Sequence, residues 1–249
     1  MTAVPEEPSR VGLLEVPGRD GLLEIVVRSA ADAERAESGG ADRLHLMAGG
    51  EEDPRSPEPA LVGQVRRGTT RPIRVTVRLR EGYSTDGGEL VRLQGLVSAY
   101  RQVGADGVVL GFLNAHTEID LPVVTALVGE ADFGWTFDRA VDACISVDRA
   151  WRELRRLPGL DAVLTAGSPR GVTEGLDDLV ERARADGFAR SVIIAGGGLL
   201  PEHVPWLARA GVRSFQVGAA VRPLGSTKAY VDAGLVRTWR TLIDDAVRR

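Results

Sequence analysis

Residues 191–223 have the sequence SVIIAGGGLLPEHVPWLARAGVRSFQVGAAVRP, which predicts a strand, a glycine turn, a helix and a second strand in that order. The run 191–195 is apolar and β-prone, and the three glycines that follow give a turn without Cβ atoms. Residues 201–210 have the apolar spacing of a helix, and the next strand ends at a turn of small residues, 218–220. We therefore predict one βαβ unit with two parallel strands.

The rest of the chain repeats this unit. Strands are expected at 22–27, 43–47, 73–79, 108–113, 133–137, 162–165, 191–195 and the run that ends before Gly218. Eight such units in 249 residues with 43% hydrophobic content predict a (β/α)8 TIM barrel in a single domain, 21–249. A doubly wound sheet is the alternative with the same element order. Residues 1–20 hold several Pro, Gly and Glu residues and are expected to form an extension outside the barrel, with a composition that suits disorder.

The charge balance favours a small-molecule partner. The 31 basic and 35 acidic residues are spread along the chain, so no basic surface for nucleic acid or an anionic membrane is expected. No apolar run approaches the roughly 20 residues of a membrane span, and residues 1–10 lack the pattern of a signal peptide. These features predict a cytoplasmic protein. Cys144 is the sole cysteine, which excludes an intrachain disulfide and a CxxC metal or redox site.

Polar side chains interrupt the predicted strands with a period of two. Because side chains alternate along a strand, the apolar set is expected to face the helices and the mixed set to point into the barrel. The mixed set comprises Glu24, Val26, Arg28, Arg43, His45, Met47, Arg74, Thr76, Arg78, Thr136, Asp138 and Gln216. Buried charges require partners, so the two carboxylates of this set are expected to pair with Arg43, Arg74 or Arg78.

This interior admits two interpretations. One is a structural network of ion pairs that fills the barrel. The other is a site at the carboxyl ends of the strands, beneath the loop 48–59, which is rich in Gly, Glu and Pro and is expected over the barrel mouth. The floor of such a site would be formed by Arg28, Arg78, Arg80, Asp138, Arg139 and Thr165. The candidate catalytic residues are Asp138, Arg78, Arg80 and Glu24, with Asp138 as acid or base.

The two turns of small residues are candidates for an anion-binding cup. In (β/α)8 barrels the loops after the last two strands commonly hold a phosphate through backbone N–H groups. The candidate ligand-binding residues are Gly196, Gly197, Gly198, Gly218, Ala219, Thr165 and Arg139. The anion is expected at the start of the helix after the seventh strand, where free N–H groups and the helix dipole favour negative charge. The alternative is a tight packing turn without a ligand.

Segments along the predicted barrel resemble the CutC family, whose members are cytoplasmic TIM barrels historically called copper homeostasis proteins. The resemblance runs in collinear order from about residue 21 to about residue 222. It is carried by LLEIVVRS, GADRLHLMAGG, RLREGYSTD, GADGVVLGFLN, IDLP, TFDRAVDAC, AVLTAG, IIAGGG and FQVGAA. The resemblance implies a homo-oligomeric barrel, a dimer or tetramer, and a link to copper. It does not imply a reaction.

The chain departs from the family pattern at the residues that would bind copper. Val26 and Met47 stand where the family has cysteines, and Asp138 and Gln216 stand where it has histidines. Cu(I) favours thiolate and thioether ligands, with imidazole as a partner. His45 and Met47 lie two residues apart on one strand face and are therefore the candidate metal ligands. The alternative is a core histidine beside a core methionine.

Two functions from different classes stay open. The first is a protein of copper homeostasis that binds copper ions or acts in a metal-linked process. The second is an enzyme or a binding protein for a small anionic, phosphorylated ligand held at the carboxyl-terminal face of the barrel. The family resemblance favours the first function, and the residues themselves favour the second.

Overall fold

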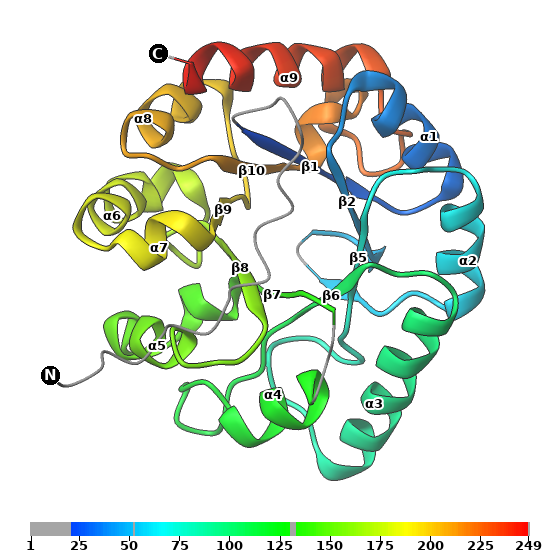
Figure 1. Ribbon diagram of the computed structural model, residues 1–249, viewed down its shortest axis with the longest axis vertical. Coiled ribbons are helices and arrows are strands. Elements are labelled where there is room, and N and C mark those ends of the chain that lie inside the picture. The colour runs from blue at the N-terminus through cyan, green and yellow to red at the C-terminus, as the bar shows by residue number, and fades with distance from the viewer. Residues whose placement is uncertain (1–20, 52, 130–132, 249) are drawn as a thin grey trace, which may run out of the picture.

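The computed structural model describes residues 21–51, 53–129 and 133–248 (Figure 1). Within these ranges eight parallel strands close into one barrel in the order β1-β10-β9-β8-β7-β6-β5-β2. Their bounds are β1 Leu22–Val27, β2 Arg43–Leu46, β5 Ile73–Thr76, β6 Gly107–Leu110, β7 Trp135–Phe137, β8 Leu160–Thr165, β9 Ile193–Ala195 and β10 Ser214–Val217. The predicted (β/α)8 barrel is confirmed. The extension predicted over residues 1–20 lies outside the described residues.

Helices follow the strands and surround the barrel (Figure 1). They are α1 Ala30–Gly39, α2 Pro59–Arg67, α3 Gly87–Gln102, α4 Leu121–Val128, α5 Val147–Leu154, α6 Val172–Ala185, α7 Gly187–Val192, α8 Val204–Arg209 and α9 Ala233–Val247. Short 3-10 turns are η1 Arg139–Ala143, η2 Pro201–His203, η3 Ala219–Val221 and η4 Pro223–Gly225. A hairpin of two short strands, β3 Ala48–Gly49 and β4 Pro54–Arg55, follows β2. The described helices include none with the length and apolar character that a bilayer span requires.

Short polar side chains placed just before the helices set several helix starts. Ser29 caps α1 by accepting a hydrogen bond from the amide of Asp32. Asp86 caps α3 and Asp232 caps α9 in the same way. Such a cap stabilises a helix by about 1 kcal/mol because it satisfies an N–H group that has no partner within the helix.

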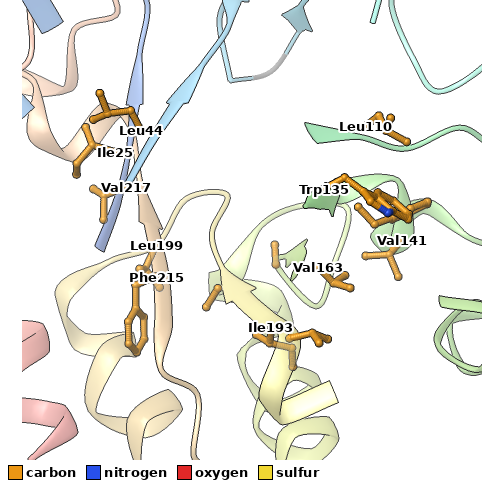
Figure 2. Packing of buried hydrophobic residues seen from close by; sticks show 14 of the residues in the cluster. Ile25, Leu44, Leu110, Trp135, Val141, Val163, Ile193, Leu199, Phe215 and Val217 are labelled. Atoms are coloured by element: carbon orange, nitrogen blue, oxygen red, sulfur yellow. The ribbon is translucent and has the colours of Figure 1, made fainter. Parts of the chain in front are cut away.

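The main hydrophobic core lies between the barrel and its helices. Outward-facing strand residues such as Ile25, Leu44 and Phe215 are fully buried and belong to one continuous cluster with the inner faces of the helices. Figure 2 shows part of this cluster, with these side chains projecting from β1, β2 and β10. A smaller apolar cluster lies apart from it and consists of Ala162, Leu164 and Ile194. The predicted division into an apolar outer face and a mixed inner face is therefore confirmed.

Two of the predicted ion pairs form inside the barrel. Arg43 donates to Glu24 with an N–O distance of 2.5 Å, and both side chains are buried. Arg78 pairs with Asp138 nearer the carboxyl ends of the strands. Each predicted carboxylate thus meets one of the predicted arginines, and the interior network is part of the folded structure.

Two glycines make room for a third buried pair, between Arg74 and Asp161. A Cβ atom at Gly107 would lie 2.1 Å from Arg74 Nη1, and a Cβ atom at Gly134 would lie 2.0 Å from Asp161 Oδ2. A side chain at either position would therefore displace the pair. The amino-terminal half of the barrel is filled by charged side chains that glycine positions accommodate.

Several predicted boundaries are wrong. The strands expected at 73–79 and 108–113 end earlier, at Thr76 and Leu110. Ser191 and Val192 belong to α7 and not to the seventh strand, because Asp186 caps an additional helix by accepting hydrogen bonds from two of its amides. The helix predicted over 201–210 is instead a 3-10 turn followed by the six residues of α8.

Candidate functional site

A cavity of about 1230 Å³ lies at the carboxyl ends of the barrel strands. Its walls come from the loops that follow β1, β2, β5, β7, β8, β9 and β10. Its floor is made by inward-facing strand residues, namely His45, Thr76, Val109, Leu164 and Gln216. This is the end of the barrel at which (β/α)8 enzymes bind their substrates.

A chain of hydrogen bonds crosses the floor of the cavity. The side-chain amide of Gln216 donates to Glu24 Oε1 at 2.6 Å and lies 2.9 Å from His45 Nδ1. Because an amide nitrogen only donates, His45 Nδ1 accepts, and its Nε2 carries the proton and donates to Thr76 Oγ1 at 2.8 Å. Arg43 completes the chain by donating to the other oxygen of Glu24. Both nitrogens of the imidazole are thus engaged within the protein.

The two candidate metal ligands, His45 and Met47, both line this cavity. Burial lowers the pKa of His45 to about 4, while the charge of Glu24 opposes this shift and that of Arg43 adds to it. The ring is therefore neutral at physiological pH. A metal ion at His45 would have to replace one of its two hydrogen bonds.

Arg78 and Asp138 form a buried ion pair in the wall of the cavity. Asp138 also accepts a hydrogen bond from the amide of Ala140 at 2.9 Å, and the guanidinium of Arg78 lies 4.4 Å from the ring centroid of Tyr83. A Cβ atom at Gly111 would lie 2.1 Å from Asp138 Oδ1, so glycine makes room for the pair. Burial raises the pKa of Asp138, although the charge of Arg78 acts against this. The wall thus offers a carboxylate and a guanidinium held side by side.

The turns after β9 and β10 present backbone donors to the cavity. Gly197 and Gly198 have φ angles of 91° and 74°, a conformation that favours glycine. The amides of Gly197, Gly198 and Gly218, here termed the open amides, donate to no other residue that the structure describes. These glycines and Ala219 all line the cavity. Both turns that the sequence singled out therefore contribute donors suited to an anion.

Arg139 lies across the turn after β9 and lines the cavity. Its Nε donates to Asp142, and its Nη2 donates to the carbonyls of Ser168 and Pro169. The guanidinium is so close to Gly197 that a Cβ atom there would lie 2.8 Å from it. Among the described residues Arg139 Nη1 has no acceptor. A charged donor therefore stands beside the open amides.

Two predicted site residues point away from the cavity. Arg80 pairs with Asp86 and Glu89, and it does not line the cavity because these carboxylates turn it outward. Thr165 donates to Asp142 at 2.6 Å and so helps to hold η1 in place. Arg80 and Thr165 therefore stabilise the loops around the cavity.

Two further predicted residues lie beneath the site. Glu24 reaches the cavity only through Gln216, to which it is hydrogen-bonded. A Cβ atom at Gly196 would lie 2.8 Å from Leu164 Cδ1 and 2.9 Å from the Cβ of Gln216, so this glycine serves packing. The helix after β9 does not reach the cup either, since α8 begins at Val204 and is six residues long. The dipole of this helix therefore does not favour an anion in the cup, contrary to the expectation from the sequence.

Several residues that line the cavity were missed by the sequence analysis. They are mainly charged and lie in loops: Glu51, Asp53, Glu81 and Arg170. The composition of the loop 48–59 predicted that this loop lies over the barrel mouth. It did not indicate that Glu51 and Asp53 would be the residues that line the cavity. Loop side chains have no period from which their direction could be inferred.

The sequence profile of the CutC family matches residues 21–220. The chain is 31% identical over 200 residues to a family protein CutC from Klebsiella pneumoniae (strain 342), with 80% of each chain covered. It is also 31% identical over 203 residues to a family protein CutC from Bacteroides thetaiotaomicron, with 79% of this chain and 80% of that protein covered.

Solved structures share the fold. A CutC structure from Streptococcus agalactiae, described as that of a copper homeostasis protein, has a TM-score of 0.71 at 19% identity and covers 80% of this chain and 98% of its own. A thiamine phosphate pyrophosphorylase from Pyrococcus furiosus has a TM-score of 0.58 at 14% identity and covers 92% of this chain and 97% of its own. Identities this low show the barrel alone. The profile and the curated relatives go further, and by them the chain belongs to the CutC family.

Proposed function

We propose that the mouth of the barrel binds a small anionic ligand and that a phosphate ester is the class it suits best. The observation that carries this proposal is that the open amides and Nη1 of Arg139 line one cavity. Phosphate oxygens accept several N–H bonds at once, and charge-assisted bonds from arginine are roughly twice as strong as neutral ones.

The cavity has room for more than an inorganic ion. Its volume of about 1230 Å³ exceeds the roughly 300–1,000 Å³ of typical small-molecule sites. Away from the glycine turns, Gln216, Arg78 and Asp138 can hydrogen-bond hydroxyl or carbonyl groups of the ligand. An enzyme would use Asp138 as its acid or base, whereas a binding protein would use the same pair only to orient the ligand.

Copper is the second candidate, supported by family membership. The described residues fit it poorly, because His45 uses both ring nitrogens and burial raises the pKa of the Cys144 thiol to about 12. Cys144 lines a separate small cavity with Glu118 and Ser146, away from the barrel mouth. Within the described ranges no three His, Cys, Asp or Glu side chains are grouped to hold a metal ion. Competition against a Cu(I) chelator tests this candidate, and stoichiometric binding that survives Cys144→Ser would favour it.

We further propose that the protein works in the cytoplasm as a homo-oligomer, a dimer or tetramer. The support for both points is the resemblance to a family of cytoplasmic, oligomeric barrels. Light scattering on the purified protein tests the oligomeric state, and fractionation of the source cells tests the location.

The central experiment measures anion binding by calorimetry and by the shift in melting temperature. We expect millimolar phosphate, sulfate and sugar phosphates to stabilise the wild-type protein, because a ligand that binds only the folded state raises its stability. In Gly198→Val the new side chain would enter the cavity and block the open amides, so this stabilisation should be lost.

The matched control is Gly129→Val. Gly129 also has a positive φ, and among the described residues nothing lies within 4 Å of a Cβ atom placed there, but it lies outside the cavity. Both variants introduce backbone strain of about 1–3 kcal/mol, so a loss of binding in Gly198→Val alone is a local effect. If the wild-type protein shows neither heat nor a melting shift with any of these anions, the proposed function is wrong.

A further inference from the structure

The carboxylate of Glu51 lies against the backbone of Gly218. A Cβ atom at Gly218 would lie 2.1 Å from Glu51 Oε1 and 2.4 Å from Oε2. The amide of Ala219, the next residue, hydrogen-bonds to this carboxylate and favours its charged form. An anionic group of the protein itself therefore occupies the small-residue turn after β10.

Three guanidinium groups act on Glu51 without touching it. Arg222, Arg28 and Arg139 favour the charged carboxylate through space, yet among the described residues Glu51 forms no ion pair. These arginines are held by other groups: Arg222 by Asp32, Arg139 by Asp142, and Arg28 by the carbonyl of Thr227. Burial is the larger influence and raises the pKa of Glu51. A neutral side chain would be easier to bury here, so the carboxylate needs an explanation other than stability.

We propose that Glu51 is a resident counter-anion of the cup, which holds the place beside Gly218 until the anionic group of a ligand displaces it. This inference rests on the proposed function and adds how the site is kept closed without ligand. It also narrows the ligand class. A dianionic phosphate or sulfate can use the Ala219 amide, the open amides and Arg139 Nη1 together, whereas Glu51 brings one negative charge.

The position of Glu51 in the fold allows such an exchange. It lies in the connection between β3 and β4, two strands of two residues each, outside the barrel sheet. The far side of this hairpin is anchored independently, because Arg55 donates to the carbonyl of Leu79 at 2.8 Å and Ser56 Oγ accepts from the amide of Arg78. Displacement of the Glu51 carboxylate can therefore leave the anchored side of the hairpin and the barrel in place.

Calorimetric titration with sulfate tests the inference in the wild-type protein, Glu51→Gln and Glu51→Ala. Sulfate keeps its charge across the working range of pH, so changes in affinity report on the protein. If the cup is open in about a tenth of the molecules, removal of the counter-anion should lower the sulfate Kd about tenfold. Glu58→Gln is the control, since it removes one negative charge close to the same hairpin, but Glu58 is exposed and does not line the cavity.

The pH dependence gives a second readout. As the pH falls from neutral, protonation of Glu51 should strengthen sulfate binding to the wild-type protein more than to Glu51→Gln. The charged groups that face Glu51 are Arg28, Arg139 and Arg222, and His45, with its pKa of about 4, is neutral above that pH. Asp138, whose pKa burial also raises, is present in both proteins, so the difference between them isolates Glu51.

The outcomes separate this inference from the proposed function. Tighter sulfate binding in both Glu51 variants, with Glu58→Gln unchanged, supports the inference; if Glu51→Ala fails to fold, Glu51→Gln alone carries the test. Equal or weaker binding in Glu51→Gln overturns the inference while the proposed function stands. Absence of sulfate binding in the wild-type protein and in every variant overturns both.

Discussion

Glycine and charged residues occur in both halves of the barrel interior, but they have different roles in each half. In the amino-terminal half the space beside glycine is filled, since a Cβ atom at Gly107 would lie 2.1 Å from Arg74 Nη1. In the carboxyl-terminal half a Cβ atom at Gly198 would meet nothing within 4 Å. Glycine admits an ion pair at both ends, since Gly111 makes room for Asp138 as Gly107 does for Arg74, and at the mouth Gly198 also leaves a backbone donor open. The charges of the packed half are buried in ion pairs with one another, whereas Asp138 and Arg139 at the mouth also line the cavity.

The largest expected effect tests the packed half. Asp161→Ala leaves Arg74 buried without its counter-charge, which should lower the free energy of unfolding by about 3–5 kcal/mol. Urea denaturation measures this loss. Asp148→Ala is the control, because Asp148 pairs with Arg182 but its side chain is 76% exposed, and exposed pairs contribute little. Equal losses in the two variants would show that the interior pair is no more important than a surface pair.

The same pair marks the limit of fold prediction from the sequence. Alternation along regular strands correctly placed Glu24 and Arg43 inside the barrel. The alternation does not hold at Asp161. Trp135 pairs with Leu160 but Thr136 pairs with Ala162, so Asp161 is an extra residue in β8. A register shift of this kind changes the direction of a side chain, and the hydrophobic pattern of the sequence does not predict it.

The second effect concerns the floor that separates the two halves. The folded pKa of His45 is about 4, below its ordinary value of 6.5, so the folded state keeps the ring neutral and unfolding takes up a proton between these values. The free energy of unfolding is therefore unaffected by this group above pH 6.5. It decreases as the pH drops from 6.5 towards 4, by roughly 3 kcal/mol in total.

Urea denaturation of the wild-type protein and His45→Gln over this pH window measures that effect. His45→Gln should be less stable at neutral pH, because its side chain cannot reproduce both hydrogen bonds. Its free energy of unfolding should then fall less steeply with pH than that of the wild-type protein. Parallel curves for the two proteins would mean that His45 is not held neutral by the fold.

The third effect tests the glycine that admits the Arg74 pair. In Gly107→Ala the new Cβ would also lie 2.2 Å from the backbone oxygen of Gly134, which cannot swing aside as a side-chain end can. We expect a loss of about 1–3 kcal/mol in the free energy of unfolding. Gly63→Ala is the contrasting control: it lies in α2 with its nearest neighbour at 3.7 Å, and it should gain roughly 0.5–1 kcal/mol. Similar values for both would contradict the tight packing at Gly107.

The residues of the candidate site that lie close to strand ends could be predicted from the sequence, whereas those in longer loops could not. Gly218 and Asp138 directly follow strand ends, Gly197 lies two residues beyond one, and the structure brings all three to one cavity. Glu51 lies in a loop, and its contact with Gly218 is tertiary, so nothing local in the sequence indicates it. Arg80 was assigned to the same floor because it lies close to a strand end, but the direction of a loop side chain is set by its partners.

The smallest expected effect is that of Arg80→Ala, which tests the boundary of the mouth. Arg80 has a side chain that is 41% exposed, and its contacts are with Asp86 and Glu89 rather than with the cavity. Solvent screens such pairs, so we expect the free energy of unfolding to change little. The sulfate affinity should stay that of the wild-type protein, in contrast to Gly198→Val, which should lose it. If Arg80→Ala weakens sulfate binding as Gly198→Val does, then Arg80 turns into the mouth when ligand is present, and the open half of the barrel extends to the loop after β5.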